Sequence, residues 1–403
     1  ARASTWESLN RRYGCTAHNE GRAVSNVKVL GVISARLNSS RLPAKQLLPL
    51  AGETMVGRLF QRLEKITLVD QWVLATTADD YNVPLVEWAT AAQKSVFAYL
   101  GDVSDLVGRI DAIYRQYRPE FIVYVCGDSP LVEIDTMSGM IQLLHSSPEA
   151  EIVDYRPLPG RSQFIQGGFN VWKSAMWERI ATGSHTADER EHVGYVTRRF
   201  PPAERVAYFE DDPLYSTLWH RTSIDTLSDY KFMQTIYQRW YANHPTEEVV
   251  PLRWVIELLK QEPELMEINR HVHQRGAGEP VLRVGFAISN RENCQLAIDC
   301  ARSLQDYHAI SVVMLGGGEC NKAHEEWNLL PHQELHREMT LQKIHENEPF
   351  KLLVTDEENS SMTGVKMVQL QKLMQEDIQG VDWQRECAKW LMSQSEEEGS
   401  RSL

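Results

Sequence analysis

Short apolar runs alternate with amphipathic segments from Val27 to about residue 126, and this alternation is what most constrains the fold. The runs are rich in β-branched residues, as the buried strands of parallel sheets are. Each segment between them repeats its apolar residues at helical spacing. The expected strands are 27–34, 72–76, 96–100 and 121–125, and the expected helices are one capped by Thr54, then 84–92 and 105–117. Alternation at this spacing predicts an α/β fold with a mostly parallel sheet and right-handed crossovers.

The pattern after residue 150 is more mixed. Short strands are expected near 168–171 and 223–225, and helices at 174–180, 189–199, 228–241 and 252–260. A second, shorter alternation with expected strands at 282–288, 311–315 and 351–355 follows a segment rich in glycine and charge. At 403 residues the chain is long for one domain. We expect a polar tail 1–26, a first domain 27–270, a linker 271–281, a smaller C-terminal α/β domain 282–392 and a disordered tail 393–403.

Composition excludes several classes of protein. The formal net charge of −13 argues against a general nucleic-acid binder, which needs a basic face. The six cysteines are scattered, without zinc spacing, and no signal peptide is recognisable, so a reducing cytoplasm is expected. No apolar run approaches the roughly 18–20 residues that span a bilayer. We expect a soluble cytoplasmic protein without membrane insertion.

The polar loop Ala35–Lys45 directly follows the first expected strand. It carries Arg36, Arg41 and Lys45 together with two serines within eleven residues. A triphosphate needs several fixed cations and hydroxyl or backbone N–H donors, and this loop supplies them. In parallel sheets, ligands bind outside the carboxyl ends of the strands, where both this loop and Asp128 are expected.

Each of these signals has a plainer interpretation. A basic loop is often only solvated surface, and neither a Walker A motif nor a dinucleotide-binding glycine pattern is present. Asp128, before Ser-Pro, is also typical of a turn, and Asp225 of a helix N-cap. His192 is equally compatible with a histidine on a helix face.

The motifs together resemble a known family. The segment ARLNSSRLPAKQLLPLAG is similar to the opening of the CMP-sugar synthetase superfamily, A-R-x-x-S-[ST]-R-L-P-G-K. It most resembles the spore-coat polysaccharide cytidylyltransferase-like branch, which is related to 3-deoxy-manno-octulosonate and acylneuraminate cytidylyltransferases. The resemblance continues in the family's order over about half of the chain, through GDVSDLVGR (101–109), GDSPL (127–131), DEREHV (188–193) and SIDTLSDY (223–230).

This resemblance implies a fold and an activity. The fold would be a Rossmann-like nucleotide-diphospho-sugar transferase sandwich. The activity would be Mg-dependent transfer of CMP from CTP to an acidic or related sugar, for surface polysaccharide or glycan synthesis. The expected partners are CTP and a small sugar acceptor, with a homodimer as the assembly to test. In-line displacement at the α-phosphorus needs positioning, charge neutralisation and a metal rather than a dedicated base.

The resemblance also implies a role for individual residues. The nucleotide would be bound by Arg36, Ser39, Ser40, Arg41 and Lys45 at the phosphates and by Gly101, Asp105 and Arg109 near the base and ribose. The Mg ion would be bound by Asp128 and Asp225, and the catalytic set would be Arg36, Lys45 and Asp128. The acceptor would be contacted by Arg190, Glu191 and His192.

The chain also departs from the pattern. Ala44 replaces the usual glycine before the lysine, which matters if that position needs a positive φ. The branch's acidic G-[FL]-D-V-E motif reads Gly168-Phe169-Asn170-Val171-Trp172, without its two carboxylates. The C-terminal domain is faintly similar to nucleotide-sugar hydrolase-like proteins, but no histidine lies near 290–294, where their Gly-His motif falls. These departures keep two alternatives open: a non-catalytic nucleotide-sugar-binding or scaffolding protein, and a transferase that uses another nucleotide.

Overall fold

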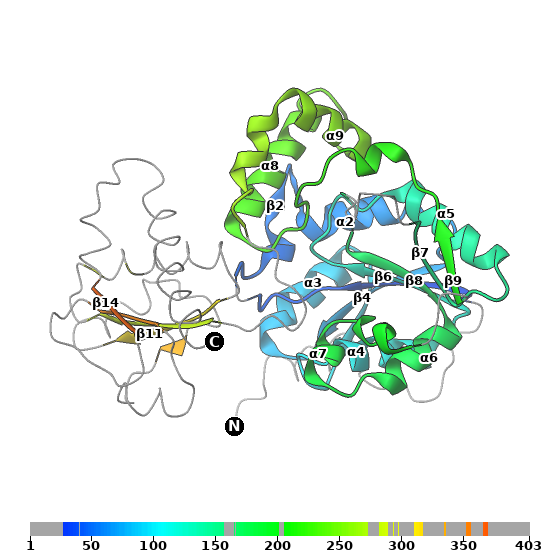
Figure 1. Cartoon of the computed structure of the whole chain (residues 1–403), viewed down its shortest axis with the longest axis horizontal. Helices are drawn as coiled ribbons and strands as arrows, with labels where there is room; N and C mark the ends of the chain where they lie inside the picture. The colour runs from blue at the N-terminus through cyan, green and yellow to red at the C-terminus, as the bar shows by residue number, and fades with distance from the viewer. Residues whose placement is uncertain are drawn as a thin grey trace, which may run out of the picture. The chain divides into compact units, whose positions relative to one another are not determined.

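The computed structural model describes residues 27–39, 41–156, 165, 167–200, 205–272 and 282–288, residues 293 and 297, and strands at 310–316, 334–335, 352–355 and 366–369. They form two compact units (Figure 1). The first contains 44–225 and 229–270 with the chain up to residue 38, and the second contains 39–43, 226–228 and the chain from 271 onward. The expected tails 1–26 and 393–403, Ser40, most of the linker 271–281 and the segment 290–292 lie outside the described residues.

A seven-stranded sheet organises the first unit, in the order β5-β4-β1-β6-β8-β7-β9. Its strands are β1 (Val29–Ser34), β4 (Gln71–Thr77), β5 (Ser95–Tyr99), β6 (Phe121–Cys126), β7 (Ile152–Tyr155), β8 (Phe169–Lys173) and β9 (Val206–Phe209). Only β8 runs antiparallel to its neighbours. The expected mostly parallel sheet is therefore confirmed.

Helices cover both faces of this sheet (Figure 1). One face of the sheet is covered by α2 (Met55–Leu63) and α5 (Ile134–Ser146). The helices α8 (Leu227–Tyr241) and α9 (Leu252–Gln261) lie on the same side of the sheet. The other face packs on α4 (Leu106–Tyr117) and α6 (Ser174–Gly183), with α7 (Ala187–Glu191) beside them, and α3 (Val83–Ala91) follows β4 in the chain. Alternate residues of the strands fill two apolar cores, one containing Val123 and the other Ile122. No described helix is long and apolar enough to cross a membrane.

Two local expectations were wrong. Residues 223–225 form no strand and instead lie in irregular backbone before α8, where their polar groups bind side chains. The expected helix 189–199 is split into α7 and a 3-10 helix, Tyr195–Arg199, because Gly194 adopts a left-handed conformation with φ of 84°. The strands β7 and β9 and the helix α5 were not anticipated, since their apolar patterns are short and interrupted.

The second unit contains a five-stranded parallel sheet in the order β12-β11-β10-β13-β14. Its strands are β10 (Leu282–Ile288), β11 (Ile310–Gly316), β12 (Glu334–Leu335), β13 (Leu352–Thr355) and β14 (Lys366–Gln369). This sheet confirms the strands expected at 282–288, 311–315 and 351–355 and shows that they are parallel.

Candidate functional site

Lys45 lies buried between two aspartates that are far apart in the sequence. Its Nζ donates to Oδ2 of Asp128 and to Oδ1 of Asp225, each at 2.9 Å, and to the carbonyl oxygen of Ile224 at 2.7 Å. Burial alone lowers the pKa of Lys45, but the two carboxylates raise it by more, and the net pKa lies above the ordinary value. The structure therefore brings together one permanent cation and two carboxylates.

The topology explains why these residues meet. Strands β1 and β6 are parallel neighbours, with Ser34 paired to Cys126, so the loops that follow them leave the same edge of the sheet. Gly127 N donates to Ser34 O at 2.8 Å, and a Cβ on Gly127 would lie 2.5 Å from that oxygen. Only glycine allows this approach, which places Asp128 beside the loop containing Lys45. Ile224 N donates to Asp128 O at 2.8 Å and brings Asp225 to the same edge.

Ala44 directly precedes the 3-10 helix Lys45–Leu47 and has φ of 54° and ψ of 20°. This is the left-handed conformation that the resemblance associates with glycine at this position. For an L-residue with a Cβ it costs roughly 1–2 kcal/mol. The loop keeps its shape with alanine, at a cost in stability.

We expect Ala44→Gly to stabilise the protein by about 0.5–1 kcal/mol, because the relief of left-handed strain exceeds the extra entropy of glycine in the unfolded chain. Urea unfolding of the full chain measures this change. Ala112→Gly, inside α4, is the control, and it should instead destabilise by up to about 1 kcal/mol. Loss of stability in Ala44→Gly would show that the left-handed conformation is not strained.

Two arginines converge on one backbone oxygen. Arg36 Nη1 and Arg109 Nη2 donate to Val103 O, at 2.5 Å and 2.8 Å. Arg109 is only 1% exposed, and among the described residues its Nε and Nη1 have no hydrogen-bond partner. Burial, and then the nearby Arg36 charge, lowers the pKa of Arg109 to about 10, so it remains a cation at neutral pH. Unpartnered donors on a buried cation are costly, and an anion would satisfy them.

The loop Ala35–Lys45 is held in place by Asn82, a contact that the sequence did not indicate. Asn82 is fully buried, and its Oδ1 accepts from Leu37 N at 2.8 Å. Its Nδ2 donates to Thr77 Oγ1 and to Asp79 Oδ1, each at 2.9 Å. Asn82 thereby links the loop to Thr77, at the end of β4. An asparagine in a polar turn carries no local signal of such a contact.

A buried polar network contacts Asp225, and the sequence did not indicate it either. Arg221 Nη2 donates to Asp225 Oδ2, and Arg221 Nε donates to Asp229 Oδ1 at 2.9 Å. Asn269 Nδ2 donates to Asp229 Oδ1, also at 2.9 Å. The residues come from 221–229 and from position 269, so only the fold reveals the network.

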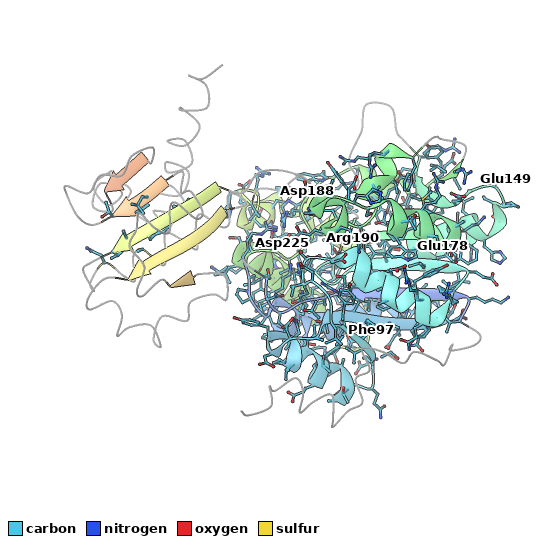
Figure 2. The ribbon with its side chains drawn as sticks, turned by 90° about the horizontal axis from the view of Figure 1, so that it is seen from below. Phe97, Glu149, Glu178, Asp188, Arg190 and Asp225 are labelled. Carbon is cyan, nitrogen blue, oxygen red and sulfur yellow. The ribbon has the colours of Figure 1, made fainter. Side chains whose placement is uncertain are left out.

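The remaining site predictions are placed as follows. Asp105 caps α4 by accepting from Gly108 N at 2.8 Å, and both of its oxygens also accept from Arg190, at 2.8 Å and 2.7 Å. Arg190, expected at the acceptor, is thus paired with a residue expected at the nucleotide. His192 has a buried Nε2 without a partner among the described residues. Gly101 lies exposed before α4, and Glu191 ends α7. Figure 2 labels Arg190, which belongs to α7, and Asp225, which precedes α8 in the chain.

Ser39 and Arg41 belong to the second compact unit, so their part in nucleotide binding stays a prediction. Ser39 Oγ accepts weakly from Leu42 N, at 3.5 Å.

The altered segment 168–172 also reaches this edge of the sheet. Because β8 is antiparallel to β6, its first residues lie beside the end of β6, and Cys126 N donates to Gly168 O at 2.6 Å. Asn170 pairs with Tyr124, whereas Trp172 is fully buried and stacks on Tyr124. Trp172 is therefore a core residue.

Cys126 is excluded as a nucleophile. Burial, and then the nearby Asp128 charge, raises the pKa of Cys126 to about 12, so it is a neutral thiol at physiological pH. The chemistry of the site rests on its cations and carboxylates.

Comparisons with known proteins agree with this geometry. A family model described as cytidylyltransferase matches residues 30–265. The 3-deoxy-manno-octulosonate cytidylyltransferase of Chlamydia pneumoniae is 32% identical over 126 residues, which are 31% of this chain and 48% of that relative. The spore coat polysaccharide biosynthesis protein SpsF of Bacillus subtilis is 26% identical over 216 residues, which are 52% of this chain and 87% of that relative.

Among solved structures, a cytidylyltransferase from Leptospira borgpetersenii has the same fold over 62% of this chain and all of its own length. The TM-score is 0.52 and the identity is 24%. The first unit therefore has the fold of a solved cytidylyltransferase.

Proposed function

Because this chain belongs to the cytidylyltransferase family, we propose that it transfers CMP from CTP to an acidic or related sugar and releases pyrophosphate. The observation that supports this most strongly is the buried contact of Lys45 with both Asp128 and Asp225. A metal–triphosphate complex needs a cation that neutralises phosphate charge and carboxylates that bind the metal ion. Lys45, Asp128 and Asp225 supply these charges. Neither the turn nor the helix-cap interpretation of the aspartates accounts for this contact.

The phosphates of CTP would bind to Arg36 and Lys45. Arg109, which the resemblance places near the base and ribose, would add further donors. Arg36 and Arg109 share one carbonyl oxygen, which leaves the other donors of Arg109 for an anion. Guanidinium donors suit phosphate oxygens because they bind in a bidentate manner. Lys45 would stabilise charge at the α-phosphorus as pyrophosphate leaves.

The residues present fit a Mg ion. Asp128 and Asp225 offer carboxylate oxygens, and Mg binds through one or two carboxylates with substrate phosphates completing its shell. No group of three or more histidine, cysteine, aspartate or glutamate side chains that could hold a metal exists among the described residues. When bound, the ion would neutralise phosphate charge and lower the pKa of the attacking hydroxyl.

The acceptor class is proposed from the relatives. One is named for 3-deoxy-manno-octulosonate, an acidic sugar, and another for spore coat polysaccharide biosynthesis. His192, which the resemblance places at the acceptor, would contact it. The product would then be a CMP-sugar for a surface polysaccharide or glycan.

Thermal unfolding of the full chain with CTP, ATP, GTP and UTP, each with and without Mg²⁺, tests the nucleotide assignment. A ligand at one hundred times its Kd stabilises by about 2.7 kcal/mol, so the preferred nucleotide should give the largest increase in Tm. We expect CTP with Mg²⁺ to give it. An equal or larger increase with another nucleotide would refute the cytidine assignment.

A non-catalytic role in binding nucleotide sugars is the second candidate. It is favoured by the segment 168–172, which reaches the site edge without the two carboxylates of the family motif. Pyrophosphate release with CTP, Mg²⁺ and a panel of acidic sugars separates the two. CTP binding without release across the panel would favour the non-catalytic role.

A further inference from the structure

We propose that Asp229 and Arg221 are positioning residues that hold the Asp225 carboxylate toward the divalent cation. This inference rests on the proposed function, in which Asp225 binds the metal. Both carboxylate oxygens and the backbone N of Asp225 are held by hydrogen bonds. Oδ1 faces Lys45 at 2.9 Å, Oδ2 accepts from Arg221, and the backbone N donates to Asp229 Oδ2 at 3.0 Å.

Asp229 is the centre of this arrangement. It is 1% exposed and accepts from Arg221 Nε, Asn269 Nδ2 and Asp225 N. These donors, one of them the Arg221 cation, help to compensate a fully buried carboxylate. Asp229 fixes both the Arg221 side chain and the backbone at Asp225, so that the Asp225 side chain has little freedom to turn.

Asn269 contacts Asp229, and His220 in turn contacts Asn269. The Asn269 amide nitrogen donates to Asp229 and, at 3.3 Å, to Arg221 O. Its oxygen must then be an acceptor, so His220 Nε2 carries the hydrogen of their 2.7 Å contact. His220 packs edge-on against Phe232, with ring centroids 4.7 Å apart. This chain of contacts thus connects Asp225 to Phe232, a buried residue of α8.

Stability alone does not account for this network, because a buried ion pair is often no more stable than an apolar replacement of equal volume. A fixed direction for Asp225 Oδ1 does account for it. Lys45 occupies that oxygen in this structure, and the oxygen lies on the same edge as Asp128. Residues that orient metal ligands typically change metal affinity or activity by about 10–100-fold when they are substituted.

Mn²⁺ binding to the full chain in saturating CTP tests the proposal without an acceptor. It is measured from the EPR signal of free Mn²⁺ against a protein-free sample with the same CTP, because CTP itself binds Mn²⁺. We expect Asp229→Asn to weaken Mn²⁺ binding by about 10–100-fold, because Arg221 and the Asp225 backbone lose a fixed charge. CTP affinity measured without metal should be unchanged. Glu151→Gln is the matched control, since Glu151 is a carboxylate paired with Arg179 and Arg205 away from the site. It should leave Mn²⁺ binding unchanged.

A second variant covers the case in which Asp229→Asn does not fold. Asn269→Ala removes one neutral donor and keeps the ion pair, and it should weaken Mn²⁺ binding in the same direction by a smaller factor. Wild-type Mn²⁺ affinity in the variant that folds would overturn the proposal, as would an equal loss in Glu151→Gln.

Two reference measurements separate this inference from the proposed function. If wild-type protein binds no Mn²⁺ with CTP, the proposed function fails and the inference fails with it. If wild-type protein binds Mn²⁺, Asp128→Asn abolishes that binding and Asp229→Asn does not alter it, only the positioning role is refuted.

Discussion

Replacing Lys45 by methionine should lower kcat for CMP transfer by about a hundredfold to a thousandfold, the usual effect of losing one preorganised group that stabilises transition-state charge. Methionine fills similar volume but cannot neutralise charge at the α-phosphorus. Because the arginines remain, CTP should still bind, so the loss should lie mainly in kcat. Pyrophosphate release, with an acceptor that supports wild-type turnover, measures it.

Lys28→Met provides the matched control. Lys28 is exposed, and its Nζ lies 4.0 Å from Glu120 Oε1 in an exposed pair, so the same substitution there should leave kcat unchanged. Thermal unfolding of Lys45→Met belongs beside the assay, since Asp128 and Asp225 then face each other without their shared cation. A folded Lys45→Met variant with wild-type kcat would contradict the role given to Lys45.

Replacing Arg109 by methionine should have two effects of opposite sign. It should stabilise the fold by about 1–2 kcal/mol, because it removes a buried cation with two unpartnered donors near the Arg36 charge. It should also weaken CTP binding by at least about a hundredfold, since two charge-assisted hydrogen bonds contribute roughly 1.5–3 kcal/mol each. Urea unfolding without nucleotide and calorimetric titration with CTP and Mg²⁺ measure the two effects.

The matched control for this variant is Arg179→Met. Arg179 donates to Glu151 at 2.7 Å and lies over the Phe200 ring, so both of its favourable contacts would be lost. That variant should be less stable than wild type and should bind CTP normally. If Arg109→Met is destabilised and binds CTP like wild type, Arg109 is a structural residue rather than a nucleotide ligand.

Features of this protein that depend on neighbours along the chain follow from the amino-acid sequence alone. The period of apolar residues predicted β1, β4, β5 and β6 and their helices, because strands and helices bury faces of different spacing. The Thr54 cap of α2 was also anticipated, and Thr54 Oγ1 accepts from Gly57 N at 3.1 Å. The resemblance indicated Lys45, Asp128 and Asp225 as one set.

The distant side chains that support that set become evident from the folded chain. Asn82 binds Leu37 across 45 positions, and Asn269 binds Asp229 across 40. Arg190 pairs with Asp105 across 85 positions. A polar residue in a turn has the same local pattern whether it faces water or a buried partner. Hydrogen-bond partners that are distant in sequence are chosen by packing, which places their donors and acceptors within reach and removes competing water.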